Sequence, residues 1–325
     1  MRAPLGSCPV ATMSCYGVLA AVLAYSIWGL SALYWSLLAH VKPEQLVSHR
    51  IVWCFVIVLS IVAATQWKSF RSYALLWPNI RLHAVAATLL ATNWWLFVWS
   101  VHAGYVVQAC LGGYILPLVT VLLGVVVMGE RLRKWQIVAI CLAGIGVLVI
   151  SIGFGVIPWL SFALALTDGA YGLIKKKSTV ASIEGVVIET GTLVLPAVGY
   201  LVFAEVQGVG AYGHGTVFTN VLLMGGGVMA TTSLITFAYA VHHMPLTLVG
   251  VLRYITPTIQ VFLAVYVYRE PFTPVNIVGF VLLWAALILF TSQSYFKHQE
   301  QLKEEAHSSL LAIASMEEAV VHKAT

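Results

Sequence analysis

The chain has 325 residues, of which 60% are hydrophobic and 9% are Asp, Glu, Lys or Arg. A soluble domain carries charge on roughly a quarter of its residues, so this composition excludes a soluble globular protein and a disordered one and indicates a polytopic membrane protein. The net charge of +5 comes with no broad basic patch for nucleic acid, and the five cysteines form no C-x-x-C pair, so we expect neither a disulfide framework nor a metal site.

Ten apolar runs are long enough to cross a bilayer, which takes about 20 apolar residues, with a range of about 17–25. In chain order the predicted spans are 14–39, 45–65, 81–103, 107–128, 135–152, 157–174, 184–204, 217–240, 246–268 and 275–296. The breaks between them are short, and Met13, directly before the first run, is a candidate translation start. The sequence therefore predicts an all-α integral membrane protein with ten transmembrane helices and a polar to amphipathic tail over 297–325.

Lys and Arg are distributed unevenly between the two sides of the predicted membrane. With the N-terminus inside the cell, the cytoplasmic side receives Arg2, Lys68, Arg71, Arg81, Arg131, Arg133, Lys134, Lys175, Lys176, Lys177, Lys297, Lys303 and Lys323. Lys42 and Arg269 then lie outside, while Arg50 and Arg253 lie within spans. Because positive charge collects on cytoplasmic loops, we predict a multi-pass membrane protein with both termini cytoplasmic.

The sequence carries an internal repeat at an offset of 140 residues. Tyr114–Pro117 (YILP) recurs as Tyr254–Pro257 (YITP), and at the same offset Glu130 recurs as Glu270. We therefore predict two repeats, which cover 14–152 and 157–296. Each repeat holds five spans, an odd number, so the second repeat enters the membrane from the opposite side. Inverted repeats are typical of transporters, whose binding site lies near the midplane between the halves.

Pro117 and Pro257 lie mid-span at matching positions of the two repeats. Each removes a backbone hydrogen bond and should bend its helix. Two interpretations stay open: they are tolerated kinks, or they form a pair of hinges and free a backbone carbonyl at the site.

Several short motifs follow one another in an order typical of one family. They are AYSIWG in the first span, Ser48-His49-Arg50 opening the second, Asn93-Trp94 with the following LFVWSV in the third, LGGYILPL and then GERL in the fourth, Tyr171-Gly172 followed by Lys175–Lys177, Ile188-Glu189-Thr190, and RYITPT with the later Glu270. In this order, over roughly residues 14–296, the chain resembles the EamA-type drug/metabolite transporter superfamily, specifically its RarD-like branch. The resemblance implies an inner-membrane permease for a small metabolite or drug, related by name to chloramphenicol sensitivity. Two positions depart from the expected pattern: Arg253 replaces a neutral polar residue, and Asp168 replaces an apolar or hydroxyl residue.

Ionisable residues inside spans cost at least about 2.5–3.5 kcal/mol each, so they are candidate functional residues that face the bundle interior. Asp168 lies near the predicted midplane, where it would be a proton or cation site, a partner for a substrate amine, or a hydrogen-bonded core acid. Glu189 and Arg253 enter from the cytoplasmic side to similar depths. We predict that these two face the central cavity and pair, either as part of the site or as a purely structural ion pair.

His49 and Arg50 lie near the outer end of the second span. The repeat maps His49 onto Glu189 on the opposite side of the midplane, so we expect these two not to be direct partners but each to form half of a gate or part of the cavity lining. Arg50 either clamps a carboxylate or phosphate with its planar guanidinium or extends toward the outer headgroups.

Aromatic and amide side chains complete the predicted transport pathway. The aromatic candidates, which would form walls with a polar tip or would simply pack, are Trp28, Trp94, Tyr114, Tyr171 and Tyr254. Asn93 would contact the ligand or hydrogen-bond to a neighbouring helix.

These features favour a secondary transporter that exports or exchanges a small molecule by alternating access. The alternative is a membrane-embedded enzyme with Asp168 and Glu189 as acid and base, although the sequence has no hydrolase, metalloprotease or cofactor motif. Inverted repeats disfavour a third interpretation, a passive channel. We expect no catalytic residue, metal or cofactor. The expected partners are a small-molecule substrate and the lipid bilayer, with protons as a candidate coupling ion and a homodimer as an open option.

Overall fold

The computed structural model describes residues 14–102, 106–154, 159–267, 274–275, 277–296 and 299–300. Its helices are α1 (Cys15–Ser36), α2 (Pro43–Thr65), α3 (Trp67–Ser69), α4 (Trp77–His102), α5 (Val106–Met128), α6 (Lys134–Phe154), α7 (Trp159–Lys177), α8 (Ser182–Val206), α9 (Val217–His243), α10 (Leu246–Leu252) and α11 (Ile255–Phe262), with π-helical turns η1 (Phe70–Ala74) and η2 (Leu263–Val267). A further apolar helix covers Ile277–Phe296. These ranges contain no strand, which confirms the all-α prediction.

Each predicted span corresponds to a helical segment. Eight segments of the described chain are long and apolar enough to cross a membrane. A ninth is obtained when α4 is counted together with the short segment Trp67–Ala74, from which it is bent by 94°. α7 carries Asp168 and ends in Lys175–Lys177, so it is more charged than the others, yet its 19 residues pack against α4 and α5. The fold is therefore that of a polytopic membrane protein.

Side-chain caps at helix starts explain some boundaries and one contact between the halves. Ser14 caps α1 by accepting a hydrogen bond from the Gly17 N–H at 3.3 Å. Glu130, in the loop after α5, caps a helix distant in sequence. Its carboxylate accepts hydrogen bonds from the N–H groups of Leu246 (2.5 Å) and Thr247 (2.8 Å) at the start of α10. Backbone donors at a helix start are otherwise unpaired, so this contact fastens the second half of the chain to the first.

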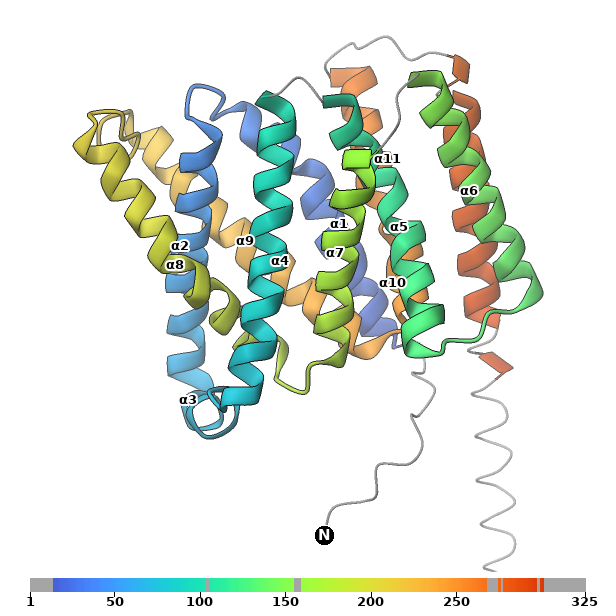
Figure 1. The fold of residues 1–325 in the computed structure, drawn as a ribbon, viewed down its shortest axis with the longest axis horizontal. Helices are drawn as coiled ribbons and strands as arrows, with labels where there is room; N and C mark the ends of the chain where they lie inside the picture. The colour runs from blue at the N-terminus through green and yellow to red at the C-terminus, as the bar shows by residue number, and fades with distance from the viewer. Residues whose placement is uncertain are drawn as a thin grey trace, which may run out of the picture.

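The contacts between the two halves come in matching sets. Where a helix of the first half packs on helices of the second half, its repeat counterpart packs on the counterparts of those helices. α1 packs on α9 and α11, and α7, its counterpart, packs on α4 and α5. Counterparts also face each other directly, since α2 packs on α8 and α5 packs on α10. In Figure 1, α4 rises from the lower edge to the upper edge while its counterpart α9 descends. This is the arrangement expected of halves related by a two-fold axis in the membrane plane.

Tyr114 and Tyr254, equivalent positions of the repeat, meet in the interior. The Tyr254 hydroxyl donates a hydrogen bond to the Tyr114 carbonyl at 3.2 Å, across 140 residues of chain. Equivalent residues of a two-fold arrangement can touch only near its axis, so this contact marks where the axis would pass. Glu270, the repeat counterpart of Glu130, lies outside the described residues.

The two mid-span prolines behave differently. The ninth span is interrupted at Arg253 and Tyr254, between α10 and α11. Pro257 has no N–H to donate to the Arg253 carbonyl four residues earlier, and that carbonyl instead accepts from the Thr256 N–H at 3.1 Å. Pro117, in contrast, lies inside α5, which is assigned as one helix through it. The prediction of matching bends therefore fits the second repeat, where the interruption places Arg253 in the middle of a span.

Replacing Gly227 by Ala is expected to lower the free energy of unfolding by about 1–3 kcal/mol, as overpacking does in a filled interior. A Cβ on Gly227 would overlap the Cβ of Trp53 and lie 2.9 Å from the Cys54 backbone nitrogen, where α9 crosses α2. Gly199 in α8 is the matched control, because a Cβ there meets nothing within 4 Å. Thermal unfolding in detergent should show Gly227→Ala destabilised and Gly199→Ala unchanged or more stable. Equal shifts would contradict the close crossing of α2 and α9.

Candidate functional site

Three polar side chains from α4 and α7 contact Glu189 of α8 in the interior, and a fourth, Ser178, contacts one of them. Its Oε1 accepts hydrogen bonds from the Lys175 ammonium (2.8 Å) and from His83 Nδ1 (2.7 Å), and its Oε2 accepts one from the Tyr171 hydroxyl (3.0 Å). His83 Nε2 lies 2.9 Å from the Ser178 hydroxyl. We call these five residues the glutamate cluster. The Lys175 and Glu189 side chains are each only 1% exposed, so the carboxylate is held by a nearby cation and by two further hydrogen-bond donors, away from lipid.

Hydrogen-bond roles in the glutamate cluster are mutually consistent. Ser178 Oγ accepts a hydrogen bond from the Val180 N–H at 3.2 Å, which leaves its own proton free to donate to His83 Nε2. His83 Nδ1 then carries a proton that it donates to Glu189. Lys175 is the permanent cation that pairs with the carboxylate.

Gly185 in α8 lets the donors approach Glu189. A Cβ at Gly185 would lie 2.5 Å from His83 Cε1 and 3.1 Å from Lys175 Nζ. A larger residue would therefore displace both donors, so the α8 backbone is part of the site's construction.

A second charged pair lies between α7 and the interruption of the ninth span. The Arg253 guanidinium donates a hydrogen bond to Asp168 Oδ2. Its central carbon lies 5.3 Å from the Trp28 ring centroid, 5.8 Å from that of Tyr25 and 5.7 Å from that of Phe237. We call Asp168 and Arg253 the arginine pair. The rings add cation–π attraction to the charge–charge attraction between Arg253 and Asp168, so both attractions hold the guanidinium in place.

The predicted pairing of Glu189 with Arg253 is wrong. Asp168 and Lys175 lie seven residues apart on α7, which places them on one face of the helix about two turns apart. Each therefore meets a different partner: Arg253 binds Asp168 near the middle of α7, while Lys175 binds Glu189 near its end. Arg253 and Asp168, the two departures from the expected family pattern, are thus partners of each other.

Arg50 is the third interior cation. Its guanidinium carbon lies 4.2 Å from the centroid of the Trp94 ring, and its buried Nε has no hydrogen-bond partner among the described residues. Arg50 lines a cavity of about 10 Å³, the size of a water molecule, together with Ile51, Cys54, Leu90, Trp94, Glu189, Thr190, Leu193, Ala230 and Leu234. The cavity thus brings together Arg50, Trp94 and Glu189, which the sequence predicted for the pathway.

The remaining predicted pathway residues fall into packing or lining positions. Asn93 donates hydrogen bonds to the Leu164 carbonyl (2.8 Å) and the Thr167 hydroxyl (3.0 Å), which favours a helix–helix contact between α4 and α7. His49 packs against the Tyr212 ring, with centroids 5.4 Å apart. The Glu189 partners come from α4 and α7, in agreement with the expectation that His49 is not one of them.

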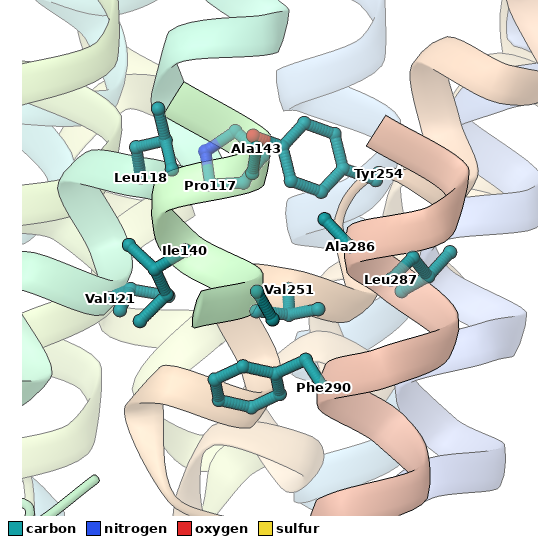
Figure 2. Close-up of a pocket in the computed structure, with 11 residues that line it drawn as sticks. Pro117, Leu118, Val121, Ile140, Ala143, Val251, Tyr254, Ala286, Leu287 and Phe290 are labelled. Carbon is teal, nitrogen blue, oxygen red and sulfur yellow. The ribbon is translucent and has the colours of Figure 1, made fainter. Parts of the chain in front are cut away.

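A second small cavity is almost wholly apolar (Figure 2). It has a volume of about 10 Å³ and lies between α5, α6, α10 and the helix Ile277–Phe296. Pro117 and Tyr254 face it, alongside aliphatic side chains and Phe290. Such a lining suits packing near the predicted hinge and does not suit a charged ligand.

Sequence reasoning missed His83, Ser178 and the inward direction of Lys175. Lys175 begins a run of three lysines at a span end, and such a run is typical of cytoplasmic positive charge. The available signal was its spacing of seven from Asp168, which places it on the face of α7 that carries the interior acid. His83 lies two residues into a predicted span, where no charge partner is visible in the sequence.

Comparison with known proteins adds three observations. Residues 15–152 match the EamA-like transporter family. The chain is 38% identical to Protein RarD of Streptomyces exfoliatus over 276 residues, 85% of this chain and 88% of that protein, and 37% identical to the uncharacterized transporter YojE of Bacillus subtilis (strain 168), over 85% of this chain and 93% of that one. A solved crystal structure superposes with a TM-score of 0.67 at 18% identity, covering 86% of this chain and 97% of that chain, which supports the fold.

Proposed function

Because the chain belongs to the EamA-like transporter family, in its RarD-like branch, we propose that it is a secondary-active permease that exports or exchanges a small metabolite or drug by alternating access. It is a membrane transporter and not an enzyme, since its family and relatives are transporters. The observation that carries the proposed mechanism is the cavity beside Arg50, Trp94 and Glu189. It lies between α2 and α4 of the first half and α8 and α9 of the second, where an alternating-access site is expected.

The proposed repeats cover 14–152 and 157–296, with Pro117 and Pro257 as hinges. The interchangeable helix contacts and the meeting of Tyr114 with Tyr254 support this division. The family match over 15–152 coincides with the first repeat. On this account the halves rock about the Tyr114–Tyr254 contact, and the interruption at Arg253 absorbs the change in backbone direction.

The proposed pathway follows the interior charges and rings. Its residues are Trp28, His49, Arg50, Asn93, Trp94, Tyr114, Asp168, Tyr171, Glu189, Arg253 and Tyr254, to which the structure leads us to add His83 and Lys175. Arg50 lies toward the predicted outer end of α2, and Glu189 lies toward the predicted cytoplasmic end of α8. A substrate that passes between them would therefore meet residues from both sides of the midplane.

We propose an inner-membrane location with both termini in the cytoplasm. The start of α1 and the end of the helix Ile277–Phe296 lie at the same lower side of the bundle (Figure 1), which fits an even number of crossings. We expect green fluorescent protein fused after Phe296 to fluoresce and alkaline phosphatase at the same position to be inactive. The reverse pattern would contradict the orientation, and a fusion after Gly208, between α8 and α9, is the opposite-side control.

Solute counterflow in proteoliposomes tests the transport proposal. Vesicles that hold the purified full chain and an excess of unlabelled solute should accumulate labelled solute transiently, with amino acids, nucleosides and amphenicols as the first panel. A signal that collapses with a proton ionophore in gradient-driven uptake would support proton coupling. Flux without counterflow would contradict a carrier and favour a channel.

A further inference from the structure

We propose that Arg50 binds the anionic headgroup of the substrate, and that the substrates are organic monoanions, foremost carboxylates, with an aromatic or aliphatic body. This inference rests on the proposed transport function and deepens it, because it assigns a chemical class to the ligand of the interior cavity.

Arg50 is an interior cation without a counterion among the residues that the structure describes. Within the described part of the chain it makes no hydrogen bond and no ion pair, and its Nε is shut off from solvent. Its guanidinium instead makes a cation–π contact with the face of the Trp94 ring. The Arg50 side chain is partly buried within a membrane-spanning helix, where a charge without a partner is costly, so a site that keeps one unpaired is expected to receive a counterion from outside.

Lys175 and Arg253, the two other interior cations of the site, each have an acidic partner inside the protein. Lys175 pairs with Glu189, and Arg253 pairs with Asp168. Glu189 lines the same cavity as Arg50 but directs its carboxylate at Lys175, His83 and Tyr171. The cavity therefore keeps an excess of positive charge on the Arg50 side.

Glu184 is a further buried acid, and its charge bears on the balance of charges around the cavity. In the part of the chain that the structure describes, its Oε1 has no hydrogen-bond partner. It lies in the first turn of α8, where the helix dipole favours a negative charge. It is also five residues, or about 7.5 Å along the helix, nearer the predicted cytoplasmic end than Glu189, and it does not line the cavity.

The stacked Arg50 guanidinium and the lining of the cavity indicate the shape and charge of the ligand. An arginine stacked on an aromatic face keeps its edge N–H groups free, and these match a carboxylate with two parallel hydrogen bonds. One guanidinium neutralises one negative charge, which favours a monoanion over a phosphate dianion. Apart from Glu189 and Thr190, the rest of the wall is apolar and includes Ile51, Leu90, Leu193 and Leu234. That wall favours an apolar body attached to the anionic group.

The cavity is too small for an organic ligand in this conformation. Its volume of about 10 Å³ accommodates a water molecule and not an organic anion. Binding must therefore accompany separation of the two halves around α2, α4, α8 and α9, as alternating access requires.

A matched series of phenyl compounds tests the charge preference. Titration calorimetry on the purified full chain would compare 3-phenylpropionate, 3-phenylpropanamide, 3-phenylpropylamine and phenyl phosphate. The carboxylate should bind, the amide and the amine should bind at least tenfold more weakly, and phenyl phosphate should fall between. Arg50→Met should weaken the carboxylate at least tenfold and leave the amide unchanged, while Arg50→Lys should lose less. Arg81→Met, at an exposed position of α4, should change nothing.

Thermal unfolding without ligand gives a second readout. If Arg50 is held for a ligand, Arg50→Met should unfold at the same or a higher temperature than the wild type, and 3-phenylpropionate should stabilise only the wild type. A strong drop in unfolding temperature would assign Arg50 a structural role and overturn the proposal. Equal binding of acid and amide, tightest binding of phenyl phosphate or of the amine, or no binding of the acid would also overturn it. Counterflow of a neutral or cationic solute in the same preparation would leave the transport function standing, so the two failures are distinguishable.

Discussion

Replacing Lys175 by Met is expected to lower the free energy of unfolding by about 3–5 kcal/mol, the usual cost of removing one partner of a buried ion pair. Glu189 would keep its hydrogen bonds to His83 and Tyr171 but would lose the cation that pairs with its charge. Both side chains of the pair are almost fully buried, so water cannot replace the lost cation. Unfolding by sodium dodecyl sulfate in mixed micelles measures the change.

Two variants make the Lys175 prediction specific. Lys177→Met removes a lysine from the same run at an exposed position and should have an effect within about 0.5 kcal/mol. The double variant Lys175→Met/Glu189→Gln removes both charges and should recover most of the loss. If Lys175→Met behaved like Lys177→Met, Lys175 would be a topology-setting lysine and not an interior partner.

Replacing Arg253 by Gln is expected to abolish transport and to lower the free energy of unfolding by about 1.5–3 kcal/mol, the range for hydrogen bonds to charged groups. The stability loss is smaller than for Lys175 because the Arg253 and Asp168 side chains remain 12% and 17% exposed. The same change also removes the cation that lies against Tyr25, Trp28 and Phe237. Counterflow and thermal unfolding measure the two effects separately.

The double variant Asp168→Asn/Arg253→Gln separates structure from transport. It leaves no unpaired charge and should fold nearly as well as the wild type, yet it should stay inactive because both polar groups of the proposed pathway have changed. Intact folding and full transport in Arg253→Gln alone would show that the arginine pair is not essential.

The fold could be predicted from the sequence because membrane insertion leaves a strong one-dimensional signal. Long apolar runs and short breaks identify helices, and the YILP and YITP motifs at an offset of 140 indicate the two halves. The exception is the interruption at Arg253. Proline chemistry alone predicts a similar bend at Pro117, where α5 is assigned as one helix.

Ion partners could not be predicted in the same way, because pairing depends on helix rotation as well as depth. Glu189 and Arg253 have similar predicted depths, but Glu189 faces α7 and α4, while the break after α10 places Arg253 beside Asp168. A lysine run at a helix end fixes topology whichever way one of its members points. Lys175 turns inward because Gly185 leaves room on α8, a contact between segments that the sequence does not place together.

Accessibility of Cys54 tests the central claim that the interior cavity opens to one side at a time. Cys54 is buried and lines the cavity with Arg50. In a background without the other native cysteines, Gly17→Cys/His243→Cys would install a lock between the start of α1 and the end of α9, on the predicted cytoplasmic side. A Cβ on Gly17 lies 3.5 Å from the His243 Cβ, within the range of a disulfide, and 2.8 Å from Met244 Cγ, so the flexible Met244 side chain must move aside.

Labelling of Cys54 with a membrane-impermeant maleimide, read by peptide mass spectrometry in oriented vesicles, gives the decisive result. With the lock oxidised, Cys54 should react only from the outer side, and after reduction it should react from either side. Reaction from the cytoplasmic side with the lock closed, or no reaction from either side after reduction, would contradict alternating access through this cavity.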